Sequence, residues 1–247
     1  MAQTKDFPGD KPLVTVEYGQ GSVYVLRMKR LPENRFDTNF IHNAIIPALD
    51  FVTAEFNAAQ SNGKCIALVT TSEGKFYSNG LDIDHALSTQ GFMKNTYLHL
   101  LSRFLSLPFP TVAAINGHCF AGGMMLALAH DYRIQRRTRG YMCMNEVAIG
   151  LPLLPGMSAL LRQKLTPLVY RKAVLEGTRF TGDQALADGL VDAVADEDVL
   201  TCAVERAAKL AEIGAKGVWG ALRTEMYGET LRLLEEGDDD LASRAKM

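Results

Sequence analysis

One stretch decides the fold of this chain: Asn116-Gly117-His118-Cys119-Phe120-Ala121-Gly122-Gly123-Met124-Met125-Leu126-Ala127-Leu128-Ala129. It leads from an apolar strand, Thr111 to Ile115, into a helix that is apolar on nearly every side and must therefore be buried. Two glycines mark the start of this helix, where free backbone N–H groups and the positive end of the helix dipole lie. Because glycine lets a ligand approach the main chain closely, the turn predicts a site for a developing negative charge.

The composition is that of an ordinary soluble globular protein. The chain has 247 residues, of which 47% are hydrophobic and 22% charged, and its formal net charge is −2. This length is enough for one large core with a helical appendage. The near-neutral charge predicts neither a nucleic-acid partner nor a membrane-surface partner. No apolar run reaches the roughly 18 residues of a membrane span, and the N-terminus lacks the apolar core of a secretory signal.

The cysteines do not indicate a metal site. The four of them are scattered without CxxC spacing, at Cys65, Cys119, Cys143 and Cys202. We interpret them as small hydrophobic residues in a reducing compartment, and we expect no bound metal.

Hydrophobic periodicity outlines an α/β chain. Leu13–Tyr18 and Val23–Lys29 alternate as a hairpin, and a helix is expected from Asp37 or Thr38 to about Gln60. Cys65–Thr71 reads as a buried strand, followed by a glycine-bearing loop over 73–84.

Helical spacing returns between about Phe92 and Leu107, and strands are expected at Thr111–Ile115, Tyr132–Arg136 and Tyr141–Glu146. From Pro155 onward the pattern is almost wholly helical. We therefore expect an N-terminal extension over 1–12, a core over 13–196 with helices from about 155, and a C-terminal helical region with a polar tail over 197–247.

Three blocks give the chain a resemblance to the crotonase (enoyl-CoA hydratase/isomerase) superfamily, from about Leu13 to about Val194. Lys75-Phe76-Tyr77-Ser78-Asn79-Gly80-Leu81-Asp82-Ile83 is similar to the F-S-x-G-x-D-[LI] loop of that family. The opening stretch is similar to its N-G-x-x-x-G-G-G segment, with Ala121 at the first of the three glycines. Asn145-Glu146-Val147-Ala148-Ile149-Gly150-Leu151-Pro152 is similar to its P-E-x-x-x-G-x-x-P segment. The order and spacing of all three blocks carry the resemblance.

The resemblance implies a crotonase-like spiral of ββα units with a C-terminal helical region, assembled as homotrimers or as hexamers made of two trimers. It also implies that two backbone N–H groups stabilise a thioester enolate, and their positions here are Leu81 and Gly122. The helix start supports Gly122 independently, whereas Leu81 rests on the motif alone. A coenzyme A thioester would be the substrate, with no separate cofactor.

The acid–base residues point to the reaction. Hydratases of this family carry two glutamates, one in the buried helix and one in the third block. At the helix position this chain has Met125, which cannot exchange a proton, but it keeps Glu146. A single carboxylate resembles the Δ3,Δ2-enoyl-CoA isomerases, which move a proton from C2 to C4 of a 3-enoyl thioester. The alternatives are an enoyl-CoA hydratase with a displaced acid, another crotonase-type acyl-CoA reaction, and a non-catalytic binding member of the fold.

Glu146 lies in the sequence among Met142, Met144, Val147 and Ile149, so we expect it to be poorly solvated and to have a raised pKa. A surface position or a pairing with an arginine is the alternative without the motif. His118 and the His130-Asp131 pair are interpreted as structural. His42, His85 and His99 stand alone and are interpreted as incidental.

Substrate contacts are predicted with the help of the resemblance. Arg30 and Arg35 flank the loop after the second strand, where the family contacts coenzyme A, although ordinary surface placement is an equal alternative. The family also implies contacts along the first block and an acyl pocket that uses residues from about Phe92 to Leu101. The predicted substrate-binding set beyond the two arginines is Ser78, Gly80, Asp82, Ile83 and Met125.

The last three residues, Ala245-Lys246-Met247, resemble the small–basic–aliphatic tripeptide that the peroxisomal import receptor binds. They predict a peroxisomal enzyme of fatty-acid β-oxidation. If the tripeptide is coincidental, a cytoplasmic location is expected.

Overall fold

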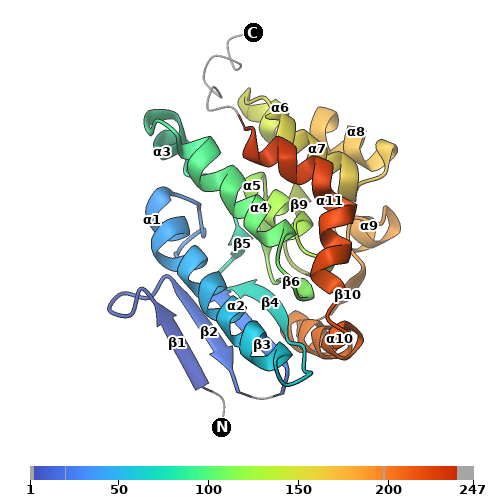
Figure 1. Cartoon of the computed structure of the whole chain (residues 1–247). Helices are drawn as coiled ribbons and strands as arrows, with labels where there is room; N and C mark the ends of the chain where they lie inside the picture. The colour runs from blue at the N-terminus through green and yellow to red at the C-terminus, as the bar shows by residue number, and fades with distance from the viewer. Residues whose placement is uncertain (1–2, 20, 197, 238–247) are drawn as a thin grey trace.

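The computed structural model of the chain describes residues 3–19, 21–196 and 198–237. These residues form a large seven-stranded sheet and a small three-stranded sheet, with helices packed around both (Figure 1). The predicted α/β class is confirmed. Within the described ranges, no helix is both long and apolar enough to cross a membrane.

The large sheet begins antiparallel and continues parallel. Its first three strands pair antiparallel and the later ones parallel, and each parallel pair is joined by a crossover connection. In order across the sheet, the strands are β1 (Gln3–Phe7), β2 (Val14–Tyr18), β3 (Val23–Met28), β4 (Ala67–Ser72), β6 (Thr111–Ile115), β8 (Tyr132–Arg136) and β10 (Ala193–Ala195). The predicted hairpin is β2 and β3. The edge strand β1 lies in the segment expected to be an extension, and β10 interrupts the region expected to be almost wholly helical.

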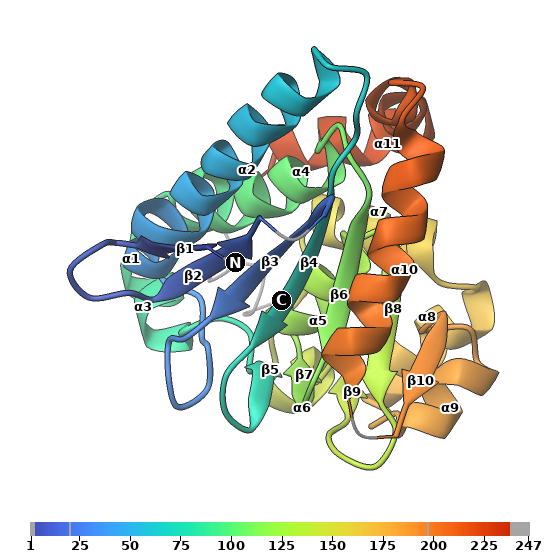
Figure 2. The ribbon, with the colours of Figure 1, turned by 90° about the horizontal axis from the view of Figure 1, so that it is seen from below.

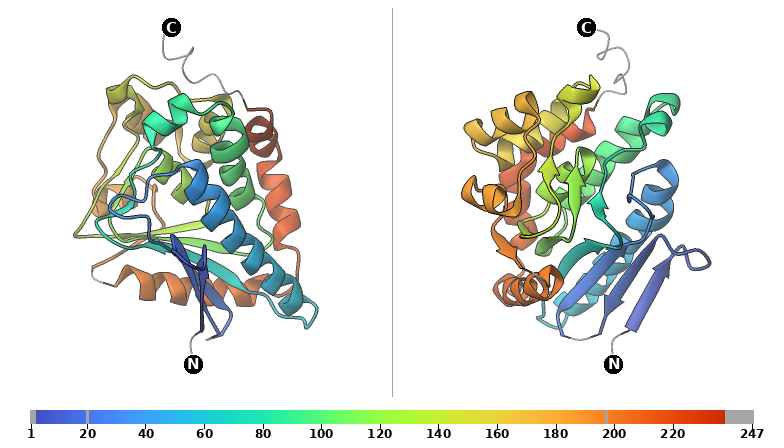
Figure 3. Two further views of the ribbon diagram at one scale, coloured as in Figure 1. Left: turned by 90° about the vertical axis from the view of Figure 1, so that its left-hand side faces the viewer. Right: turned by 180° about the vertical axis from the view of Figure 1, so that it is seen from behind.

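The small sheet consists of three parallel strands: β5 (Phe76–Ser78), β7 (His118–Phe120) and β9 (Met142–Cys143). Each follows a strand of the large sheet after a short loop and leads into a helix, namely α3 (Ile83–Ser88), α5 (Gly122–Leu128) and α6 (Glu146–Ile149). The chain therefore repeats a ββα unit. Because the three strands are parallel, the turns that follow them lie together at one edge of the small sheet (Figure 3).

The predicted strand over Tyr141–Glu146 is shorter in the structure. Only Met142–Cys143 pairs, and Glu146 is the first residue of the short helix α6 rather than the end of a strand. This helix ends at Gly150 in the left-handed conformation, with φ of 69°.

Two long helical segments pack beside the sheets, and both contain a π turn. The first consists of α1 (Thr38–Phe40), η1 (Ile41–Ile45) and α2 (Ile46–Gln60), and begins where the Asp37 side chain accepts a hydrogen bond from the N–H of Phe40. The second consists of η2 (Met93–Leu98) and α4 (His99–Leu105). Both segments were predicted, but the π turns were not.

The C-terminal helices pack partly on the large sheet and partly on other helices. They are α7 (Pro155–Lys164), α8 (Pro167–Glu176), α9 (Gly182–Ala187), α10 (Val199–Gly214) and α11 (Trp219–Glu235). Helix α10 crosses one face (Figure 2), where Ala203, Ala207 and Ala211 form a stripe of small side chains that lets the helix approach the strands. Helix α11 packs against α7 and α4 near the other face.

A buried ion pair joins α11 to the sheet. The Arg223 guanidinium donates to Asp131 at 2.6 Å and also to the carbonyl oxygens of Phe104 and Leu105. Both charged groups are almost inaccessible to solvent, so each depends on the other for compensation of its lost hydration. This pair helps to hold the helix that closes the core behind α5.

Candidate active site

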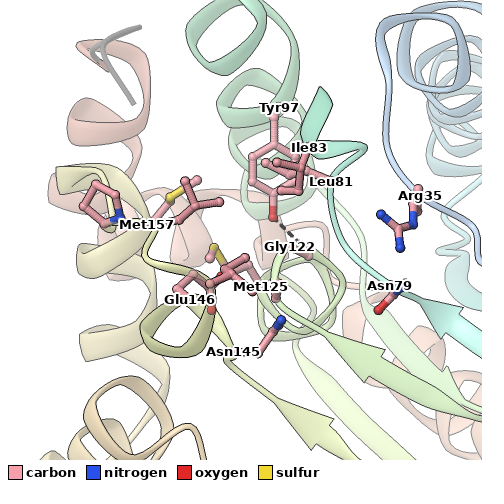
Figure 4. A pocket seen from close by; sticks show the side chains of 14 residues that line it. Arg35, Asn79, Leu81, Ile83, Tyr97, Gly122, Met125, Asn145, Glu146 and Met157 are labelled. Atoms are coloured by element: carbon pink, nitrogen blue, oxygen red, sulfur yellow. Dashed lines mark hydrogen bonds between the residues drawn. The ribbon is translucent and has the colours of Figure 1, made fainter. Parts of the chain in front are cut away.

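The three sequence blocks meet at a pocket. The pocket has a volume of about 180 Å³ and lies at the edge of the small sheet where β5, β7 and β9 end (Figure 4). Its lining residues come from all three blocks, from η2 and α7, and from the loop before α1: Arg35, Asn79, Leu81, Ile83, Tyr97, Ala121, Gly122, Met125, Asn145, Glu146, Ile149, Leu151, Pro152 and Met157.

The pocket has a polar end and an apolar end. Arg35 and Asn79 lie at one end, and Met157 lies at the other (Figure 4). Gly122 and Met125 lie between them. A ligand with a polar head and a hydrocarbon tail matches this arrangement, with its central atoms beside the start of α5.

Both predicted backbone donors line this pocket. Gly122 is the first residue of α5, so its N–H has no partner within the helix. Leu81 forms a parallel bridge with Phe36, whose hydrogen bonds are made by Gly80 O (2.8 Å) and Asp82 N (2.9 Å). The N–H of Leu81 is therefore directed to the opposite side of the bridge. Two amides on separate segments thus border the same pocket.

Close packing of the two backbone segments positions these amides. Gly80 has φ of +79°, and a Cβ on it would lie 3.0 Å from the Gly122 nitrogen and 3.0 Å from the Ala121 Cβ. A Cβ on Gly123 would lie 2.5 Å from the carbonyl oxygen of Ser78. Glycine at these positions is required because one loop rests directly on the other.

Further hydrogen bonds fix the turn before α5. Ala121 adopts φ of 47° and ψ of −120°, a conformation that normally requires glycine, and its N–H donates to Cys143 O at 2.8 Å. The Tyr97 hydroxyl donates to Gly122 O at 2.8 Å. The turn is thereby held from β9 on one side and from η2 on the other.

Glu146 is buried in the pocket wall. It is 8% exposed, and the burial raises its pKa to about 7. Its Oε2 atom has no hydrogen-bond partner among the described residues. Of the four sequence neighbours expected to bury Glu146, Met142 and Met144 are buried, whereas Val147 and Ile149 are 51% and 47% exposed. Residues distant in sequence, including Met125 and Tyr97, line the same pocket as Glu146.

If Glu146 is the catalytic base, the reaction rate is expected to depend on pH as this carboxyl group ionises. Since only the ionised carboxylate removes a proton, kcat/KM is expected to rise with pH through about 7 and to level off above it. The folded-state pKa lies above the usual 4.5, so the stability of the fold is expected to fall as pH rises between about 4.5 and about 7. A pH–rate profile that is flat across the neutral range would be incompatible with Glu146 as the base.

Met125 lies in the pocket wall at the position where the second acid of a hydratase is expected. It is buried and lines the same pocket as Glu146. Among the described lining residues, Glu146 is the only carboxylate. The pocket therefore combines one proton acceptor with two amide donors.

The predicted substrate contacts divide into two groups. Arg35, Ile83 and Met125 line the pocket, and Arg30, Ser78, Gly80 and Asp82 do not. Ser78 is fully buried, and its hydroxyl donates to Asn34 O at 2.8 Å and accepts from Gly80 N at 3.1 Å. These bonds shape the loop that carries Leu81.

The two other residues outside the pocket form ion pairs. The Arg30 guanidinium pairs with Asp37 and lies 3.6 Å from Asp82. Asp82 also caps α3 by accepting a hydrogen bond from His85 N at 3.3 Å. The two side chains thus link the first helix to the loop after β5.

Several lining residues were missed in the sequence. Asn79 and Asn145 lie inside the quoted blocks, next to the residues that were chosen. Tyr97 lies in the Phe92–Leu101 segment that was expected to contribute to an acyl pocket. Met157 had no local signal, because only the packing of α7 brings it to the site.

The histidines near the site have structural contacts. The His118 ring packs against Phe76 and Phe120, and burial lowers its pKa. His130 is fully buried, with one ring nitrogen 2.8 Å from Leu126 O and the other 2.9 Å from the Thr70 hydroxyl. Neither histidine lines the pocket.

Comparison with known proteins gives consistent matches over most of the chain. The sequence profile for enoyl-CoA hydratase/isomerase matches residues 19–235. Enoyl-CoA delta isomerase 3 from Arabidopsis thaliana is 34% identical over 91% of this chain and 96% of its own length. The peroxisomal enoyl-CoA delta isomerase 2 of the same plant is 33% identical over 87% of this chain and 92% of its own.

The predicted spiral fold is confirmed by a solved structure. The crystal structure of an enoyl-CoA hydratase from Mycobacterium ulcerans superposes with a TM-score of 0.76. It is 25% identical in sequence, and the match covers 95% of this chain and 100% of that chain.

Proposed function

The chain belongs to the enoyl-CoA hydratase/isomerase family, and on this premise we propose that it is a Δ3,Δ2-enoyl-CoA isomerase. The observation that carries the proposal is the pairing of Glu146 with Met125 in one pocket, beside the amides of Leu81 and Gly122. The relatives named enoyl-CoA delta isomerases support the reaction class.

The proposed reaction is a proton transfer within the substrate. The Glu146 carboxylate removes a proton from C2 of a 3-enoyl thioester, so that the C2–H bond breaks and an O–H bond forms. The thioester oxygen becomes the oxyanion of a dienolate, which accepts hydrogen bonds from the N–H groups of Leu81 and Gly122. The same carboxyl group then delivers its proton to C4, and the double bond moves from position 3 to position 2. No water molecule is consumed.

A hydratase would need a second group that can position water and protonate carbon. The apolar side chain of Met125 stands where that group would be expected, and it disfavours a water molecule at this wall. Isomerisation is therefore the reaction that the pocket supports best.

A product assay tests this proposal. The protein is incubated separately with a 3-enoyl-CoA and with the corresponding 2-enoyl-CoA, and the products are separated by chromatography. We expect the conjugated 2-enoyl-CoA from the first substrate and little 3-hydroxyacyl-CoA from either. Rapid formation of 3-hydroxyacyl-CoA from the 2-enoyl substrate would instead establish a hydratase.

We propose that Arg35 contacts the coenzyme A portion at the polar end of the pocket. Its guanidinium is partly exposed and pairs with Glu33 at 2.5 Å, so it is pre-oriented but accessible to a ligand phosphate. Arg35→Gln is expected to raise KM about two- to fivefold with kcat nearly unchanged. Arg30→Gln is the matched control and is expected to change KM less, because the Arg30 side chain lies outside the pocket lining. Equal effects of the two substitutions on KM would contradict a specific role for Arg35.

The proposed location is the peroxisome, in β-oxidation of unsaturated fatty acids. A relative named peroxisomal supports it, as does the tripeptide Ala245-Lys246-Met247, which lies outside the described residues. A fusion of a fluorescent protein that keeps this tripeptide at its C-terminus should enter peroxisomes. The same fusion without the tripeptide should stay in the cytosol. Punctate localisation that survives the truncation would show that the import receptor does not depend on these residues.

The proposed assembly is a homotrimer or a hexamer. Light scattering coupled to gel filtration would measure the mass directly. A monomer across the working concentration range would exclude it.

A further inference from the structure

Two buried acceptor oxygens in the pocket have no hydrogen-bond donor. They are Oδ1 of Asn145 and Oε2 of Glu146, neither of which has a partner among the described residues. Both residues line the pocket, and Figure 4 shows their side chains entering it from the same segment. A buried acceptor without a donor is costly, so each oxygen favours a ligand or state that supplies a hydrogen.

The backbone holds this segment against the turn that carries Gly122. Cys143 O accepts a hydrogen bond from Ala121 N at 2.8 Å, two residues before Asn145. Asn145 is also the N-cap residue of α6, but its side chain makes no capping hydrogen bond. Its amide is therefore not committed to the helix that begins with Glu146.

At Asn145 the sequence of this chain differs from the family pattern of the third block. The pattern P-E-x-x-x-G-x-x-P has proline before the glutamate, and proline offers no side-chain acceptor. Here an amide stands at that position and reaches the pocket.

We propose that Asn145 is a positioning residue for Glu146: its amide oxygen accepts a hydrogen bond from the carboxyl group while that group holds the proton taken from C2. The inference rests on the proposed function. When the C2–H bond breaks, the proton becomes the O–H of Glu146 and converts an acceptor into a donor. One proton then satisfies two oxygens that lack a partner in the resting state. The bond breaks again when the proton passes to C4.

The other ionisable groups near Glu146 already have hydrogen-bond or ion-pair partners. The Tyr97 hydroxyl donates to Gly122 O, and burial raises the pKa of Tyr97 well above its usual value, so it stays a neutral hydroxyl. Cys143 precedes Glu146 on β9, and its thiol donates to Gly177 O at 3.4 Å. Arg35 lines the far, polar end of the pocket and forms an ion pair with Glu33.

The test compares Asn145→Leu with Asn145→Asp in the full-length enzyme. Leucine keeps the approximate size but removes the acceptor. Loss of a bond to the protonated carboxyl group is expected to lower the kinetic pKa of Glu146 and to lower kcat about three- to tenfold, with KM within twofold of wild type. Aspartate places a second negative charge beside Glu146 and is expected to raise that pKa.

The outcomes are distinct. A lowered pKa in Asn145→Leu with a raised pKa in Asn145→Asp supports the proposal. A raised pKa in Asn145→Leu overturns it, because the amide then does not stabilise the protonated carboxyl group. An unchanged pH profile in both variants, with folding verified by circular dichroism, also overturns it. If wild type shows no isomerisation, the proposed function itself fails, whereas an active wild type with unaffected variants refutes this inference alone.

Discussion

Replacement of Glu146 by Gln is expected to lower kcat by about 10²- to 10⁴-fold while leaving KM within a few fold of wild type. The substitution keeps the size of the side chain and its place in α6 but removes the proton acceptor. Because Glu146 is the only carboxylate among the described residues of the pocket, no neighbour can take over its role. Steady-state kinetics with a 3-enoyl-CoA measure the loss, and a variant with wild-type kcat would contradict the assignment.

The stability of the same variant provides its control. Burial raises the pKa of Glu146 to about 7, which means that the folded protein bears a cost for the ionised carboxylate above that pH. The neutral amide of Gln avoids this cost. At pH 8 the variant is therefore expected to be more stable than wild type by up to about 3 kcal/mol in chemical denaturation. Loss of activity together with gained stability would separate a catalytic defect from a folding defect.

Replacement of Gly80 by Ala is expected to lower kcat by about 10²- to 10³-fold, the cost of one misplaced oxyanion donor. The added methyl group would lie 3.0 Å from the Gly122 nitrogen and 3.1 Å from Phe120 O, which are backbone atoms. They cannot rotate away as a flexible side chain would. The turn must shift, and the Gly122 N–H shifts with it.

Gly63→Ala is the matched control for this substitution. Gly63 has φ of +68°, close to the +79° of Gly80, but nothing lies within 4 Å of its Cβ position. Both substitutions carry the left-handed conformational cost of roughly 1–2 kcal/mol. Only Gly80→Ala adds the steric conflict, so only it is expected to reduce kcat. Equal losses of activity in the two variants would show that strain, not the position of the amide, is responsible.

The sequence pointed to the candidate catalytic residues of the pocket more readily than to the other residues that line it. Leu81, Gly122 and Glu146 were predicted as site residues and all three line the pocket, because each follows shortly after a strand of the small sheet, inside a block with fixed spacing. A backbone donor and a base must occupy set places relative to the reacting atoms, and this constraint leaves a local pattern. The ββα repeat was predictable for the same reason.

The rest of the pocket depends on contacts between distant segments. Tyr97 reaches Gly122 from η2, within the segment expected to form an acyl pocket, but no local pattern selects it there, and Met157 comes from α7 without any local signal. Ser78 was predicted as a substrate contact from its place in a motif, and the structure adds that its hydroxyl holds the loop together. The strand β10 was not predicted, because it has only three residues, Ala193–Ala195, and so short a segment shows no recognisable strand pattern between helices.

The central claim is that a single buried carboxyl group carries a proton from C2 to C4. It is tested most directly with a 3-enoyl-CoA that carries deuterium at C2, converted in ordinary water and analysed by mass spectrometry and NMR. Because Glu146 is buried, we predict that part of the deuterium appears at C4 of the 2-enoyl product, and that Glu146→Gln forms essentially no product. A wild-type product whose new C4 hydrogen comes entirely from water would contradict this account.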